Sequence, residues 1–193
     1  YFDIIKDRLY IFAPRSEARR SAQTALYKIA DTLCRLMSPI LVFTADEAWE
    51  NLPGQSVASV HIAEFPALAE SRTLADSLRS DWERIFAIRD DVLKALEEAR
   101  NNKQIGSSLE AKVILTTDGT TTRFLLDRYE QLRYIFIVSQ GEVHEGDALS
   151  VEIQKAEGEK GERCWNYSTR VGEFTEYPTI CERWADALNE MAP

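Results

Sequence analysis

Two cysteines near the end of the sequence are spaced like one half of a zinc-binding site. Cys164 lies three positions after Gly161, and Trp184 lies three positions after Cys181, with sixteen residues between the two cysteines. Two Cys-x-x-Cys pairs at such a separation would supply the four thiolates of a structural zinc site. Glycine and tryptophan stand at two of the four ligand positions, and neither of the two histidines is close in sequence. We therefore expect a degenerate zinc-knuckle tail that binds no zinc.

Aromatic packing is expected to replace the missing metal, because an indole ring buries much more apolar area than a thiol. The side chains expected to pack together are Trp165, Tyr167, Tyr177 and Trp184.

A terminal helix is expected after Pro178, with Thr179 as its N-cap and Glu182 in the reciprocal capping position. The only other cysteine is Cys34, and a small odd number of cysteines fits a reducing compartment better than a disulfide framework. A disulfide between Cys164 and Cys181 stays open as an alternative.

Basic residues gather at the other end of an acidic chain. Residues 1–35 contain seven Lys or Arg against four Asp or Glu, whereas the whole chain of 193 residues has a formal net charge of −9. An acidic protein is poorly suited to broad, non-specific nucleic-acid binding, which depends on neutralising phosphates. A local basic surface can still contact RNA, and its candidate residues are Lys6, Arg8, Arg19 and Arg20.

The basic residues fall on segments with helical periodicity. In residues 16–37 apolar side chains recur at the spacing of one helical face, from Ala22 through Ile29 and Leu33 to Leu36. Ser38-Pro39 should end this helix. A second helix is expected from Thr44, which with Glu47 forms a capping box, to Pro53-Gly54. Residues 1–12 read as the end of another helix, and residues 60–65 as a short extended segment. We expect such apolar faces to form the core of a helical bundle.

The pattern changes after the strongest helix, residues 74–101, which ends near Gly106. Alternation in residues 109–115 and 149–153 predicts strands, the continuous apolar run 134–138 predicts a buried strand, and residues 122–131 predict a helix after a turn at Asp118-Gly119. Strand, helix, strand, strand is a small α+β layer.

The expected fold class is therefore multi-domain α and α+β. The expected division is a helical bundle in residues 1–104, a small α+β domain in 105–156, and the zinc-knuckle-like tail with its helix in 157–193. No run is long and apolar enough for a membrane span, and no signal peptide is visible, so we expect a cytoplasmic protein. Because the sequence starts with Tyr inside an apolar pattern, we expect a fragment of a longer chain.

Several stretches carry a resemblance to one family. The sequence resembles the C-terminal part of bacterial isoleucyl-tRNA synthetases, which are class I aminoacyl-tRNA synthetases. The helix-pair stretch is shared with valyl and leucyl relatives, and the Cys-Trp tail is the part that points to the isoleucyl enzymes. The similar stretches are IIKDRLY (4–10), RRSAQTALY (19–27), SPILVFTADEAWE (38–50), IGSSLEAKV (105–113), AEGEKGERCWNYSTRVG (156–172) and YPTICER (177–183).

The resemblance implies an anticodon-binding bundle and a tail that folds over the anticodon stem-loop of isoleucine tRNA. The parent enzymes ligate isoleucine to tRNA with ATP and Mg and edit mischarged valine, in catalytic and editing domains of the same chain. Their His-x-Gly-His and Lys-Met-Ser-Lys-Ser motifs are absent here. The resemblance thus implies a monomeric, non-catalytic fragment that binds RNA without a cofactor of its own.

Two positions match the anticodon-reading residues of that family. Lys6 corresponds to a lysine placed against the first anticodon base, and Trp165 to an aromatic residue important for tRNA binding. Unpaired loop bases are recognised by stacking on aromatic rings and by contacts to their edges, which suits both residue types. For Trp165 a buried core role stays equally open, and Arg170 is a further candidate for phosphate contact, whereas Arg163 is expected to be merely exposed.

A second function from another class also stays open. The tail and the long helix could form a protein-interaction module with no RNA binding of its own, which the acidic balance after residue 35 favours slightly. Salt-sensitive binding to isoleucine tRNA would separate the two functions.

Overall fold

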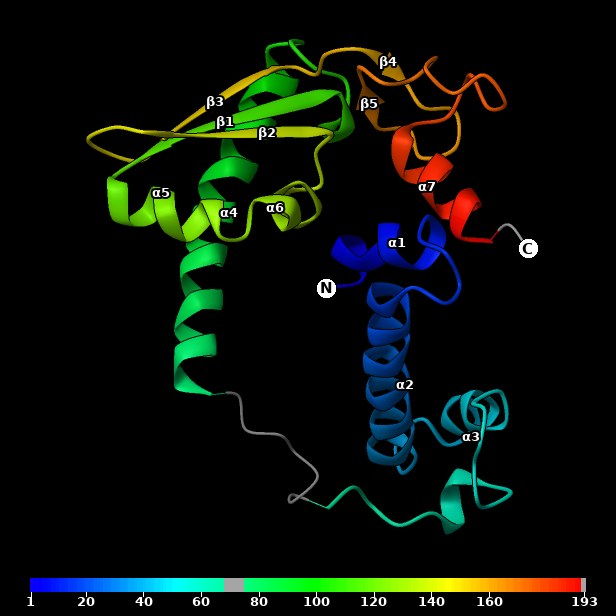
Figure 1. Ribbon diagram of the computed structural model, residues 1–193. Helices are drawn as coiled ribbons and strands as arrows, with labels where there is room; N and C mark the ends of the chain where they lie inside the picture. Colours follow the sequence, from blue (N-terminus) through cyan, green and yellow to red (C-terminus); the bar gives the residue numbers. More distant parts are fainter. Residues whose placement is uncertain (68–74, 192–193) are drawn as a thin grey trace. The chain divides into compact units, whose positions relative to one another are not determined.

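The computed structural model describes residues 1–67 and 75–191, and its contacts group the chain into two compact units (Figure 1). One unit is Arg15–Asp76, and the other combines Tyr1–Pro14 with Ser77–Pro193. The division into residues 1–104, 105–156 and 157–193 stays a sequence-based prediction. Within the described ranges, no helix is both long and apolar enough to cross a membrane.

The Arg15–Asp76 unit is built on α2 (Glu17–Met37) and α3 (Val42–Glu50), followed by the 3-10 turn η1 (Val60–Ile62). Ser16 caps α2, since its side chain accepts a hydrogen bond from the Arg19 backbone amide. The helix ends at Met37, as the Ser38-Pro39 pair predicts. Trp49, only 1% exposed, forms the centre of a small core with Cys34, Ala45 and Val60.

Two expectations about the local structure of this unit are wrong. α3 begins at Val42, so Thr44 lies inside the helix and caps nothing. Residues 60–62 form η1 rather than an extended segment, because the Asp46 carboxylate accepts hydrogen bonds from the Ser59 hydroxyl and the Val60 amide and tightens the chain there.

The apolar face predicted for residues 16–37 is not a buried core in the described unit. Ala22 is buried, whereas Ile29, Leu33 and Leu36 are 38%, 51% and 49% exposed. Phe43, at the start of α3, is 88% exposed. Periodicity identified the face correctly but could not show that the unit leaves it uncovered.

The long helix α4 (Asp76–Asn101) carries the core of the other unit. Ile85, Ile88, Val92 and Leu96 recur at helical spacing, and each is at most 5% exposed. This confirms the strongest helix expected from the sequence. The expected start at residue 74 lies outside the described residues, and the helix begins at Asp76. The chain leaves α4 through Lys103, which adopts a left-handed conformation with φ of 59°.

A three-stranded sheet covers this core in the strand order β2-β1-β3. The strands are β1 (Ala111–Thr117), β2 (Gln140–Glu145) and β3 (Ser150–Lys155), with a 3-10 turn, η3 (Ser108–Glu110), before β1. β1 pairs in parallel with β2, with Val113 opposite Gly141, and antiparallel with β3, with Val113 opposite Ile153. Every second residue of β1 is buried, and that face shares its core with α4, α5 (Gly119–Leu126) and α6 (Tyr129–Phe136) (Figure 1).

The connection from β1 to β2 corrects two further expectations. Asp118-Gly119 is no simple turn, because the Asp118 carboxylate accepts from the amides of Thr120 and Thr121 and caps α5. The apolar run 134–138 is not a strand: it belongs to α6 up to Phe136, and Ile137 ends the helix in a left-handed conformation. The second strand is instead the polar stretch 140–145. The order of elements is as predicted, strand, helix, strand and strand, except that two helices connect the first strand to the second.

The tail segment, residues 157–191, has little regular structure. A two-residue strand β4 (Glu159–Lys160) pairs antiparallel with β5 (Tyr167–Ser168), and the chain ends in α7 (Glu182–Met191). The expected capping box is wrong, since α7 begins at Glu182 and the Thr179 hydroxyl donates to Glu162. Glu182 accepts instead from the Ser168 hydroxyl at 2.6 Å, which joins α7 to β5.

Candidate nucleic-acid interface

Lys6 lies on α1 (Phe2–Tyr10), in the same unit as the tail segment. Ile5 is 3% exposed and Ile4 packs against the core of α4 and the sheet, so α1 turns Lys6 toward solvent. The Lys6 ammonium lies 2.7 Å from an Asp3 carboxylate oxygen, and this hydrogen bond raises the pKa of Lys6 and lowers that of Asp3. Both side chains are well exposed, so water and salt screen the pair and a ligand can displace Asp3.

A charged contact joins α1 to α7. The Arg183 guanidinium donates a short hydrogen bond to the Asp7 carboxylate, and Arg183 lies over the ring of Tyr134 in α6, 5.8 Å from its centroid. Burial by itself would lower the pKa of Arg183, but the charge of Asp7 and its hydrogen bond outweigh burial and raise it. Phe12 packs edge-on against the same Tyr134 ring. The first helix and the last helix of this unit are therefore held together.

Trp165 is 63% exposed and sits on a backbone turn with a positive φ of 62°. Its amide donates to the Gly161 carbonyl at 2.9 Å, which fixes the turn. The Lys160 ammonium lies over one face of the indole, 5.2 Å from its centroid. A large aromatic ring held at the surface beside a cation can stack on an unpaired base. Of the two roles considered for Trp165, the structure thus excludes a buried core position.

The predicted aromatic cluster in the tail is wrong. Trp165 and Tyr177 are exposed, and Trp184 packs beneath the Arg163 guanidinium, 5.1 Å from the ring centroid, rather than against another aromatic ring. Small and aliphatic groups fill the interior instead. Its buried residues include Gly161, Ile180, Cys181, Ala185 and Ala187.

Cys164 and Cys181 come together inside the tail segment, with their sulfurs 3.2 Å apart, and both are free thiols. The hydrogen bond between the two sulfurs lowers the pKa of Cys181, and the same bond together with burial raises the pKa of Cys164. A Cβ built on Gly161 would lie 3.1 Å from the Cys164 sulfur, so this position faces the thiols. Two sulfurs cannot complete a tetrahedral zinc shell, and no cluster of three or more potential metal ligands occurs in residues 1–67 and 75–191. These residues do not fit a zinc ion.

The predicted arginines are divided between the two units. Arg8 is half-buried on α1, and Arg170 is exposed in the tail, where its Nε donates to Glu173 at 2.9 Å. Arg19 is half-buried and Arg20 is exposed on the first turn of α2, in the other unit. One unit therefore contains Lys6, Arg8, Trp165 and Arg170, whereas Arg19 and Arg20 form a separate basic pair.

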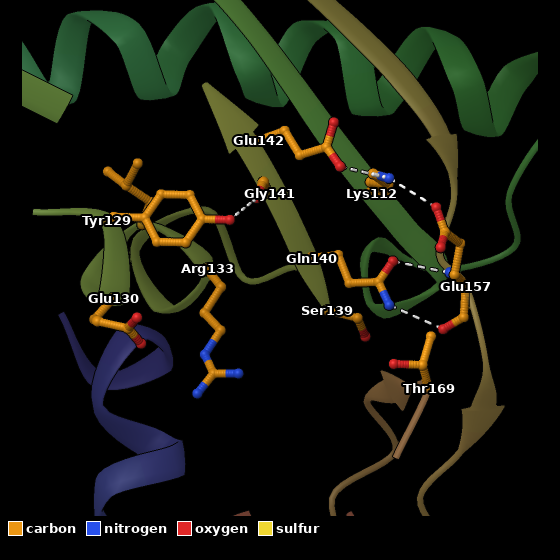
Figure 2. A pocket seen from close by; sticks show the side chains of 11 residues that line it. Lys112, Tyr129, Glu130, Arg133, Ser139, Gln140, Gly141, Glu142, Glu157 and Thr169 are labelled. Atoms are coloured by element: carbon orange, nitrogen blue, oxygen red, sulfur yellow. Dashed lines mark hydrogen bonds and ion pairs between the residues drawn. The ribbon is translucent and has the colours of Figure 1, made fainter. Parts of the chain in front are cut away.

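Sequence reasoning missed a groove between α6, the start of β2 and the tail segment, which we call the α6 groove (Figure 2). It consists of two adjoining cavities of about 380 Å³ and about 210 Å³. Both cavities are lined by Arg133, Ser139, Gln140 and Thr169. These residues come from segments with no common sequence motif, so only the fold brings them together.

The comparisons with known proteins identify the family of the chain. The family described as the anticodon-binding domain of tRNA ligase matches residues 1–115. Relatives named isoleucine–tRNA ligase occur in Syntrophotalea carbinolica, Carboxydothermus hydrogenoformans and Gloeobacter violaceus, each 45% identical over 97–99% of this chain. The chain spans only 20–22% of the length of these relatives.

Proposed function

Because the chain belongs to the family of anticodon-binding domains of tRNA ligases, we propose that it recognises the anticodon stem-loop of isoleucine tRNA and performs no catalysis itself. In a full-length isoleucine–tRNA ligase it would position tRNA for ATP-dependent aminoacylation and for editing, which the remaining domains would carry out. The tail would be a zinc knuckle that has lost its metal.

The observation that carries this proposal is the exposure of Trp165. An unpaired loop base gains about 1–3 kcal/mol by stacking on an aromatic side chain. A tryptophan that is 63% exposed on a left-handed turn has no evident role in stabilising the fold. Lys6 supports the proposal from α1, since its ammonium can exchange Asp3 for a phosphate or a base edge.

Filter binding of the chain to an isoleucine anticodon stem-loop at two salt concentrations tests the proposal. Binding should weaken with salt, with a log–log slope of about −0.7 for each phosphate neutralised. Lys6→Ala should weaken binding and make the slope less negative, whereas Lys94→Ala, which removes an exposed cation from α4, should change neither. Binding that is absent, or insensitive to salt, would contradict the proposal.

The exposed apolar residues of α2 and α3 favour a second candidate function. Ile29, Leu33 and Phe43 suit contact with protein better than contact with phosphates. The Arg15–Asp76 unit would then be a protein-interaction module. This function would be selected if the wild-type chain bound no RNA but formed a complex with a protein, and if Leu33→Asp abolished that complex.

A further inference from the structure

The β2 side of the α6 groove is rigid, because its polar groups already bond to one another. The Gln140 side chain donates to the Glu157 carbonyl and accepts from the Glu157 amide, each at 2.9 Å (Figure 2). The Tyr129 hydroxyl donates to the Gly141 carbonyl at 2.7 Å. The Lys112 ammonium lies 2.7 Å from a Glu157 carboxylate oxygen. These groups form preorganised walls and leave little polar capacity for a ligand.

Arg133 differs from the other cations of the groove. Lys112 pairs with Glu157, Arg170 with Glu173, and Arg183 with Asp7, whereas Arg133 has no ion-pair partner in the described part of the chain. Among residues 1–67 and 75–191 its guanidinium donates to the Tyr134 hydroxyl alone, at 2.9 Å, and it lies over that ring. Figure 2 shows Arg133 extending from α6 on the side of the cavity away from Lys112. The Arg133 guanidinium therefore keeps hydrogen-bonding capacity where both cavities meet, and the opposing charge in the smaller cavity is Glu182, whose pKa it helps to lower.

Charge is unequal along the groove. Three arginines line the smaller cavity, Arg133, Arg170 and Arg183, against the single carboxylate of Glu182. The larger cavity has more carboxylates than cations among its lining residues. Arg170 and Arg183 are already paired with Glu173 and Asp7, so an anionic group at the arginine end would be held mainly by Arg133, and a neutral group is favoured at the wider end. The larger cavity, about 380 Å³, is at the small end of the range for ligand sites.

We propose that the α6 groove holds one unpaired nucleotide of the bound RNA loop, with its phosphate on Arg133 and its base in the larger cavity. A guanidinium recognises phosphate with paired, charge-assisted hydrogen bonds, and Thr169 faces the same cavity with a hydroxyl group. This subsite rests on the proposed function, and it adds a contact on α6 that is separate from Lys6 and Trp165.

The subsite is tested by combining a substitution that removes the charge of Arg133 with RNAs in which one loop phosphate at a time is made neutral. Binding is measured by fluorescence anisotropy, with stem-loop RNAs that carry one methylphosphonate linkage at a time. Arg133→Gln should weaken binding about five- to tenfold. Arg123→Gln, an equal loss of charge at an exposed position of α5, should have no effect. Among the linkages to which binding by the wild-type chain is sensitive, one should be the partner of Arg133, and at that linkage Arg133→Gln should cause no further loss.

Two controls separate charge loss from misfolding. Arg133→Lys should keep most of the affinity, and the thermal midpoint of Arg133→Gln should match that of the wild type within a few degrees. Strictly additive losses at every linkage, or equal binding by Arg133→Gln and Arg123→Gln, would overturn the subsite. If substitutions of Lys6 and Trp165 still weakened RNA binding, the proposed function would survive that result.

Two other outcomes also decide the proposal. Inorganic phosphate could stabilise the wild-type chain but not Arg133→Gln, while both bind RNA equally. That result would assign the groove to a free anion and overturn the proposed nucleotide subsite. No RNA binding by the wild-type chain would overturn both the subsite and the proposed function.

Discussion

At the scale of single residues, Gly161 shows what separates this tail from a metal site. Its built Cβ lies 3.1 Å from the Cys164 sulfur and 3.6 Å from the Cys181 Cβ, so a side chain there would point at the two thiols. Its φ is outside the positive region, so a cysteine would not strain the backbone. A cysteine at position 161 would therefore bring a third sulfur close to the two thiols.

Restoring both positions should create zinc binding. Gly161→Cys combined with Trp184→Cys supplies four thiolates, and we expect about one zinc per chain with nanomolar or tighter affinity. Elemental analysis of the purified variant measures the metal, with Gly161→Ala/Trp184→Ala as the matched control. A double cysteine variant without zinc would show that the tail is not built on a zinc-knuckle frame. One zinc per wild-type chain would contradict the expected absence of metal.

Trp165 supports a second prediction at this scale. Lys160 lies over one face of the Trp165 ring, and the exposed indole should stack on an RNA base. Trp165→Ala should cost about 1–3 kcal/mol, roughly 5- to 150-fold in affinity, without reducing the thermal midpoint. Phe86→Ala, which removes another exposed ring of the same unit, is the control. A large loss of stability in Trp165→Ala would mean that the ring has a structural role after all.

At the scale of elements, the periodic spacing of apolar residues predicted helices and strands well where only one face of the element is buried. The period of α4 and the alternation of β1 follow directly from side chains that face one common core. The run 134–138 misled, because buried strands and buried helix ends are equally apolar over five residues. β2 was missed because QGEVHE is polar, and it holds its place at the sheet edge by backbone pairing with β1. The α6 groove is lined by residues of β1, α6, β2 and the tail segment and was therefore not predictable.

The buried face of α4 should dominate the stability of its unit. Leu96 is fully buried, so Leu96→Ala should lower the free energy of unfolding by about 2–5 kcal/mol. Leu78→Ala on the same helix should cost much less, since Leu78 is 44% exposed. Urea unfolding monitored by circular dichroism gives both values. Equal losses would show that α4 does not pack as described.

The cap of α5 should make stability depend on pH. Hydrogen bonds from Thr121 lower the pKa of Asp118 in the folded chain, so the charged carboxylate stabilises folding above its ordinary pKa of 3.8. This stability should disappear as the pH falls through the lowered pKa. Asp118→Asn should therefore be less stable than the wild type at pH 7, and the difference should shrink toward pH 2 in urea unfolding. A difference independent of pH would contradict the cap.

At the scale of the whole chain, residues far apart in sequence are joined by the contact between Asp7 and Arg183. Arg183 is 8% exposed and Asp7 is 27% exposed, so losing one partner leaves a largely buried charge. Asp7→Ala should cost about 2–3 kcal/mol, somewhat below the range for fully buried pairs. Combining it with Arg183→Met should recover part of the loss in a double-mutant cycle. Additive losses would show that the two residues do not interact.

The function proposed for the chain is that it reads an unpaired anticodon loop rather than RNA charge in general. The most direct measurement compares the affinities of the intact chain for two hairpins with the same stem, one with the isoleucine anticodon loop and one closed by a tetraloop. We expect the anticodon loop to bind at least about tenfold more tightly, and Trp165→Ala to remove most of that difference. Equal affinity for both hairpins would contradict the claim.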